Sequence, residues 1–215
     1  MEPRRAPVRP SPPGHPARRV TDRGSAMVET ALVAPLFLLL VFGVLEVGYA
    51  WLGRTTVTNM SVSAARAGSG QADDVLADHA LLRAVQGGAA SLGSARITMV
   101  VVYRATGPDD RVPAACRSAS VTNSTTARGC NRYVAADLLR PSTDFGCVGP
   151  PGPATKPDRF WCPTTRKTAL QGAKGPPDYV GVYVEAAHDQ LVGIGWPAFT
   201  FTQDTVMRIE PRTLS

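Results

Sequence analysis

Four cysteines are the residues whose type and spacing most directly predict chemistry in this chain of 215 residues. Cys116, Cys130, Cys147 and Cys162 stand 14, 17 and 15 residues apart, in a region rich in proline, glycine, serine and threonine. The spacing contains no Cys-x-x-Cys pair, which argues against a zinc site. Three disulfide pairings are possible, and we favour Cys116–Cys130 with Cys147–Cys162 because each closes a short loop.

Motifs for catalysis are missing from the sequence. His15, His79 and His188 are scattered, without the spacing of metal ligands. There is no Gly-x-Ser-x-Gly, phosphate-binding loop, dinucleotide fingerprint or His-Glu-x-x-His. The adjacent acids Asp73-Asp74 and Asp109-Asp110 are typical of solvated turns or helix caps. We therefore expect no enzyme activity, no cofactor and no metal site.

One apolar segment dominates the N-terminal part. Residues 31–45 are uncharged, and apolar flanks extend this run over about residues 26–52. Glu29 and Glu46 lie roughly 25 Å apart on a helix, so each carboxylate would reach an opposite edge of a hydrocarbon core about 30 Å thick. Tyr49 and Trp51 fall where interfacial aromatic residues are expected. The pattern predicts one transmembrane helix.

The net charge of +6 is concentrated before this helix. Residues 1–24 hold six arginines against Glu2 and Asp22, and therefore +4 of that charge. The positive-inside rule predicts a cytoplasmic N-terminus and an extracytoplasmic domain after about residue 53, where disulfides can form. A charge confined to a tail disfavours a nucleic-acid partner. The arginines are Arg4, Arg5, Arg9, Arg18, Arg19 and Arg23.

The remaining chain predicts an α+β fold with a small antiparallel sheet and long disulfide-stapled loops. The helix is expected to continue over 54–67 and to stop at Gly68-Ser69-Gly70, and a second helix is expected to begin at Asp73-Asp74. Its stripe of Val75, Leu82 and Val85 is interpreted as a core face; a partner-binding stripe is the alternative. Strands are expected over 96–103, 179–185 and 199–209, the last broken near Asp204. One or two helical turns are expected over 133–139, within a long loop of residues 107–178.

The junction before the apolar helix reads Gly24-Ser25-Ala26-Met27-Val28-Glu29 and follows the basic leader. It resembles the processing site of type IV prepilin-like proteins, in which a membrane aspartyl peptidase cuts after the glycine. That resemblance implies a cut between Gly24 and Ser25, with Glu29 as the fifth residue of the mature chain. The junction residues alone leave open that Gly24 is a linker residue and Glu29 an interfacial carboxylate.

The segment from Gly24 to Ser69 resembles the N-terminal part of the TadE-like and TadG-like proteins of tight-adherence pilus systems. Thr30 stands where major pilins often carry an aromatic residue, which argues against a major fibre subunit. The matching features are Gly24, Glu29, Pro35, Glu46-Val47-Gly48, Ala64-Ala65-Arg66-Ala67 and the C-terminal Met207-Arg208-Ile209-Glu210-Pro211.

The resemblance implies a minor pseudopilin that assists assembly or anchoring of a Flp-type pilus. Its implied partners are other pilin-like subunits, the pilus assembly machinery, a prepilin peptidase and membrane lipid. The implied organisation is a basic cytoplasmic leader (1–24), a transmembrane helix (25–53), a helical stalk (54–94) and an extracytoplasmic α+β domain (95–215). The alternatives are a membrane-tethered binding domain unrelated to pili and a secreted enzyme released after Ala50.

Overall fold

Helix α1 (Arg23–Gln71) is the first element of a computed structural model that describes residues 23–90, 92, 96–118, 129–149, 153–173, 175–188 and 199–211. The predicted leader, residues 1–22, lies outside the described residues. The chain forms two compact units, Met1–Gly43 and Val44–Ser215. Of the described helices, α1 is the one long and apolar enough to cross a membrane.

The apolar half of α1 exposes its side chains, as a lipid-facing helix does. Leu32, Leu36 and Leu40 each expose more than 60% of their surface. The helix then continues through residues 54–67 as predicted, and it extends past Gly70 to Gln71. It ends where buried Ala72 takes a φ of 52°, a left-handed conformation that stops the helical hydrogen-bond ladder.

A four-stranded antiparallel sheet follows, in the order β2 (Cys130–Tyr133), β1 (Ile97–Ala105), β3 (Tyr179–His188) and β4 (Phe199–Arg208). Central strands β1 and β3 are rich in valine, which suits positions buried on both faces. Pairing of β3 with β4 runs without interruption from Tyr179↔Arg208 to His188↔Phe199. These features confirm the α+β fold with a small antiparallel sheet.

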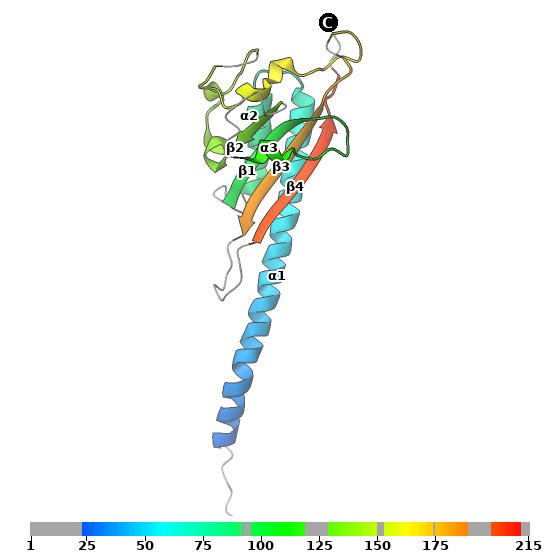
Figure 1. The fold of residues 1–215 in the computed structure, drawn as a ribbon. Helices are drawn as coiled ribbons and strands as arrows, with labels where there is room; N and C mark the ends of the chain where they lie inside the picture. The colour runs from blue at the N-terminus through cyan, green and yellow to red at the C-terminus, as the bar shows by residue number, and fades with distance from the viewer. Residues whose placement is uncertain are drawn as a thin grey trace, which may run out of the picture. The chain divides into compact units, whose positions relative to one another are not determined.

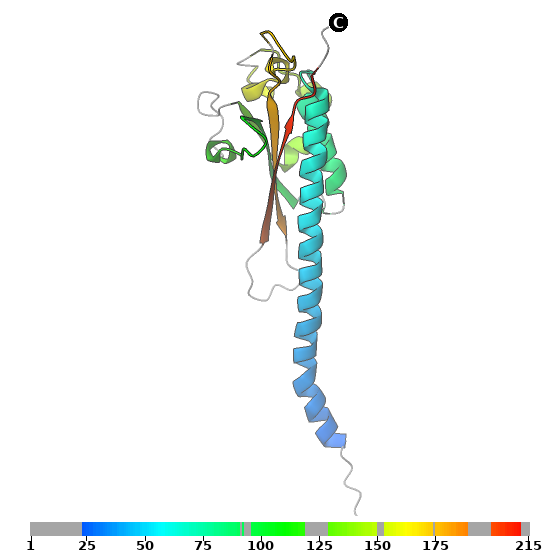
Figure 2. The ribbon, with the colours of Figure 1, turned by 90° about the vertical axis from the view of Figure 1, so that its right-hand side faces the viewer.

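Helices cover one face of the sheet, as the edge-on view shows (Figure 2). The second half of α1 and helix α2 (Ala77–Ala89) lie on this face, while the short helix α3 (Ala114–Arg117) lies on the other (Figures 1 and 2). The helical side holds the larger core, with Met60, Leu81 and Val182 fully buried. The opposite side holds a smaller core around Val101, Tyr103 and the two cysteines of the first disulfide.

Helix α1 is tied to the sheet by polar contacts as well as packing. The hydroxyl of buried Ser61 donates to the Val182 carbonyl at 3.0 Å, and its Oγ lies 2.8 Å from the Thr205 hydroxyl oxygen, within hydrogen-bond distance. Near the end of the helix, Ser69 Oγ donates to the Arg208 carbonyl at 2.7 Å. The second half of the helix therefore contacts both β3 and β4.

Three sequence expectations need correction. Helix α2 begins at Ala77, because Asp73 and Asp74 lie in the preceding turn, where Asp74 Oδ1 accepts a bond from the Leu76 amide. Val75 therefore lies outside the buried stripe, which consists of Ala77, Leu81, Leu82, Val85 and Ala89 among its apolar members. Strand β4 is not broken at Asp204, whose backbone pairs with Tyr183.

The long loop between β1 and β3 contains more regular structure than its composition indicates. Strand β2 was not expected, and it pairs with β1 from Val100↔Tyr133 to Tyr103↔Cys130. The helical turn expected near residues 133–139 is a 3-10 helix over Ala135–Leu139. Further 3-10 turns lie at Ser142–Asp144, Arg159–Trp161 and Pro163–Thr165.

Candidate functional site

The residues of the predicted processing junction all lie in the N-terminal turns of α1. Gly24 and Ser25 are exposed in the first turn, and exposed Glu29 follows about one turn later. Thr30 Oγ1 donates to the Ala26 carbonyl at 2.8 Å, a side-chain bond to the helix backbone four residues earlier. The bond between Gly24 and Ser25 is therefore sterically accessible in this unit.

Packing in the structure does not require Gly24 to be a glycine. A Cβ built at this position meets no atom within 4 Å. Glycine lowers helix stability relative to alanine, by about 1 kcal/mol in a helix interior and by less at the helix start, where Gly24 is the second residue of α1. The first four amides of a helix also have no intrahelical acceptor, so opening this turn breaks few hydrogen bonds. These features leave the start of α1 with little local stabilisation.

A second polar contact lies where α1 leaves its apolar part. Glu46 Oε1 lies 3.0 Å from His188 Nε2, at the end of β3. The His188 ring lies 5.9 Å from that of Phe201, which in turn lies against Gly53, where an added Cβ would come within 3.1 Å of the Phe201 ring. Sequence reasoning predicted Glu46 near a membrane edge but found no role for His188, because their separation of 142 residues leaves no local pattern.

A polar cluster is buried between α2, β2 and the loop after β2. Asp78 Oδ2 accepts bonds from the Tyr133 hydroxyl at 2.6 Å and from Asn131 Nδ2 at 2.7 Å, while Oδ1 accepts one from Arg166. All four side chains are fully buried. Burial, reinforced by the Asp78 carboxylate, raises the pKa of Tyr133 well above 10.0, so the phenol remains a donor. No local sequence pattern predicted this cluster.

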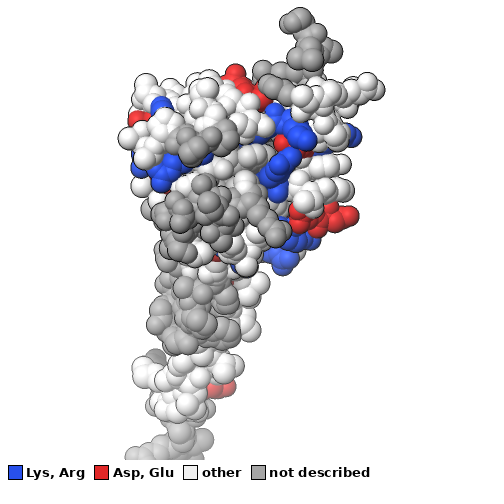
Figure 3. Space-filling model, turned by 45° about the horizontal axis from the view of Figure 1, so that its top comes forward, with Lys and Arg blue, Asp and Glu red and all other residues white. Residues whose placement is uncertain are grey.

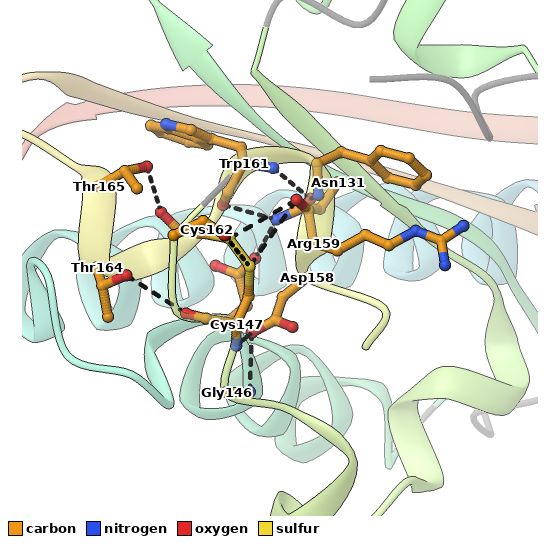
Figure 4. Close-up of a disulfide and its surroundings, with 12 residues drawn as sticks. Asn131, Gly146, Cys147, Asp158, Arg159, Trp161, Cys162, Thr164 and Thr165 are labelled. Atoms are coloured by element: carbon orange, nitrogen blue, oxygen red, sulfur yellow. Dashed lines mark hydrogen bonds between the residues drawn. A yellow bond between two sulfur atoms is a disulfide. The ribbon is translucent and has the colours of Figure 1, made fainter. Parts of the chain in front are cut away.

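Both disulfides join the pairs that short loop closure favours, Cys116–Cys130 and Cys147–Cys162. Asn131 connects the second disulfide to the polar cluster, because its Oδ1 accepts bonds from the amides of Phe160 and Trp161 (Figure 4). The first disulfide belongs instead to the smaller core on the opposite sheet face.

The loop closed by the second disulfide is held by side-chain bonds to its backbone. Asp158 Oδ2 accepts the amides of Gly146 at 3.0 Å and Cys147 at 3.1 Å, and Thr165 Oγ1 donates to the Cys162 carbonyl at 2.8 Å (Figure 4). Burial raises the pKa of Asp158 above 3.8, while the two amide bonds act in the opposite direction. These bonds hold in place the described parts of the loop on either side of residues 150–152.

These arrangements serve positioning and structure. The acid, amide and phenol of the Asp78 cluster are shielded from solvent, so their bonds order the core rather than meet a substrate. Within the described ranges, no three His, Cys, Asp or Glu side chains gather as a metal site would require. Surface charges of both signs lie next to each other on the domain face drawn in Figure 3.

Comparison with known proteins places the resemblance on α1. The model of the family described as TadE-like protein matches residues 24–66, a range that includes Gly24, Glu29, Pro35 and Glu46. This match confirms the resemblance of the N-terminal segment to that family. No curated protein and no solved structure matches the chain.

Proposed function

We propose that this chain is a non-catalytic, single-pass membrane protein of the pseudopilin kind, which assists assembly or anchoring of a tight-adherence pilus. The observation that carries the proposal is the TadE-like match over residues 24–66, because it coincides with the processing junction and the exposed apolar helix. The alternative of a membrane-tethered binding domain shares the anchor but needs no processing and no pilin-like neighbours.

The anchor is the apolar part of α1. Its side chains between Met27 and Leu52 have almost no protein cover, whereas an apolar helix needs either a core or lipid. The arginines that precede it favour insertion with the N-terminus in the cytoplasm, and the two disulfides suit a domain on the oxidising side. We therefore infer an extracytoplasmic domain after residue 53.

Processing between Gly24 and Ser25 would change the electrostatics of the helix end. The new ammonium of Ser25 would add positive charge where the helix dipole is already positive. Glu29 lies about one turn away on the exposed helix surface, so its carboxylate can compensate that charge in its own chain or in a neighbouring helix. Packing of several such helices would then be favoured in the bilayer, where unpaired charges are costly.

N-terminal sequencing of the full chain isolated from membranes tests the proposal. A start at Ser25 supports the pseudopilin, an intact Met1 supports the tethered domain, and a start at Trp51 supports secretion after Ala50. The variant Gly24→Ala should reduce processing while the chain remains in the membrane. Gly43→Ala is the matched control, because an added Cβ at Gly43 also meets no atom within 4 Å.

The role at the pilus needs its own measurement. Cells that lack this chain should show reduced surface pili, as measured in sheared pilus fractions, and the wild-type gene should restore them. Cells that carry only Gly24→Ala should resemble the deletion if processing is required for the role. Normal pili in the deletion would favour the tethered binding domain instead.

A further inference from the structure

The exposed apolar surface of α1 continues into the stretch of the helix whose other side contacts the domain. Val47, Trp51 and Leu52 expose 70%, 71% and 54% of their surface. The next outward-facing positions are polar, beginning with Arg54 and Thr55. The surface that suits lipid therefore ends near Leu52.

The other side of the same helical stretch contacts the domain. Glu46 contacts His188, the last residue of β3, at 3.0 Å. Gly53 lies against Phe201, near the start of β4. Among the described residues, contact with the sheet is therefore already present at Glu46. This is about 9 Å before the apolar surface ends at Leu52, since six helical residues rise about 1.5 Å each.

The length of α1 gives the depth at which this overlap occurs. From Met27 to Glu46 the helix rises about 28 Å, close to the hydrocarbon thickness of about 30 Å. A bilayer measures about 40–45 Å with its headgroups, which leaves roughly 5–8 Å of headgroup layer on each side. The stretch from Glu46 to Leu52 therefore corresponds to the headgroup layer, and Trp51 is a residue type typical of that layer.

We propose that the end of the β3–β4 pair, consisting of Ala187, His188, Thr200 and Phe201 and called here the sheet tip, lies in the headgroup layer of the bilayer that holds α1. The partner of this surface is lipid, because the sheet tip contacts α1 at Glu46 and Gly53. Those contacts lie at the same level along the helix as the exposed apolar side chains of Val47, Trp51 and Leu52. The proposal depends on the membrane anchor of the proposed function and not on its role at the pilus.

The polar groups of the sheet tip are compatible with this location. His188 and Glu46 are partners of each other, so neither enters the layer as an isolated buried charge. His188 is only 5% exposed, and Phe201 covers it on the sheet side at a ring distance of 5.9 Å. Thr200 is exposed and uncharged, so contact with headgroups costs it little.

A fluorescent thiol label measures the depth of the sheet tip in vesicles of phosphatidylcholine and phosphatidylglycerol that contain a headgroup-attached nitroxide quencher. The four native cysteines are all in disulfides, so an introduced cysteine is the reactive thiol. Full-length chain carries the label at Thr200→Cys, with Ser63→Cys as the matched control. Ser63 is also exposed, but it lies on α1 about 17 Å beyond Leu52. Leu52→Cys reports whether the helix is inserted.

Quenching at Thr200 should be several-fold stronger than at Ser63 and comparable with that at Leu52. A label at Thr202, two residues along β4, should show intermediate quenching, and it replaces Thr200 if that variant does not fold. Quenching at Leu52 with only weak quenching at both threonines would overturn the sheet-tip proposal and leave the anchor intact. Weak quenching at Leu52 as well would overturn the anchor and the sheet-tip proposal together.

Discussion

Asp78 of α2 and Arg166 form an ion pair in which neither side chain is exposed, although the residues are 88 positions apart in the chain. The Arg166 guanidinium also lies 4.3 Å from the centre of the Trp161 ring. The pair therefore joins the helical layer to the loop that carries the second disulfide, and its loss should affect both.

Replacing Arg166 by methionine should lower the free energy of unfolding by about 3 kcal/mol, because the buried Asp78 carboxylate would lose its cationic partner. Denaturant unfolding of the full chain in detergent, followed by fluorescence, measures this change. Arg140→Met is the control, since Arg140 pairs with Asp137 while 43% exposed and should cost less than about 1 kcal/mol. Equal losses of unfolding free energy in both variants would show that the buried Asp78–Arg166 pair contributes no more than an exposed ion pair.

Gly181 lies directly under an aromatic ring, and the variant Gly181→Ala tests that packing. A Cβ at this position would overlap the Tyr103 ring, which is itself nearly fully buried. Forcing an extra carbon into such a site should destabilise the domain by about 1–3 kcal/mol. Gly107→Ala, where the added Cβ meets no atom within 4 Å, should show little loss in the same thermal unfolding series. A stable Gly181→Ala would contradict the close contact.

Removal of the first disulfide should destabilise the folded chain through its effect on the unfolded state. The Cys116–Cys130 bond closes a loop with a sequence separation of 14, for which loop closure predicts about 3 kcal/mol. The double variant Cys116→Ala/Cys130→Ala keeps small apolar side chains in the buried site. Thiol titration of denatured, unreduced wild-type chain should detect no free thiol, and any free thiol would argue against two complete disulfides.

Stability should depend on pH through Asp204. Burial raises the pKa of this carboxyl above 3.8, although bonds from the Val112 amide and the Tyr103 hydroxyl act in the opposite direction. A raised folded pKa means that the contribution of this group is complete below pH 3.8 and is lost as pH rises through the folded value. Asp204→Asn should therefore lose less stability than the wild type as pH rises through the weakly acidic range.

The opposite pH dependence of stability is expected for Asp110, so this residue is a control for the direction of the Asp204 effect. Bonds from the Thr106 amide and the Arg111 amide lower the pKa of this carboxyl below 3.8. Its contribution is present above pH 3.8 and is lost as pH falls. Unfolding curves of Asp110→Asn should therefore differ from the wild type less at acid pH than near neutrality, and a shared pH trend in the two variants would refute these assignments.

Local patterns in the sequence were sufficient for the membrane helix and for strands β1 and β3. A long run of apolar residues predicts a membrane helix, and a run of β-branched residues predicts a strand, without knowledge of the rest of the chain. The continuation of α1 beyond Leu52 was predicted for the same reason, because residues 54–67 lack proline and glycine. The end of α1 was misjudged by a few residues, since the helix stops at Ala72, which is buried by the rest of the domain. The start of α2 was misjudged because Asp74 bonds the Leu76 amide within a turn instead of opening the helix.

Long-range partners were beyond sequence reasoning. Strand β2 consists of Cys-Asn-Arg-Tyr, which has no β-pattern of its own and is a strand because it pairs with β1. Asp78 and Arg166 look like ordinary surface charges until the fold buries them together. The same holds for Glu46 and His188, whose contact depends on the position of the β3–β4 pair beside the helix.

The hydroxyl of Ser61 contacts Thr205 across a sequence separation of 144 residues, and this has a consequence for biosynthesis. The ribosome makes α1 first and β4 last, so at roughly 5–20 residues per second the apolar side of the helix waits on the order of ten seconds for its strand. Val57 and Met60, which the finished sheet buries, are exposed on the nascent chain throughout that interval.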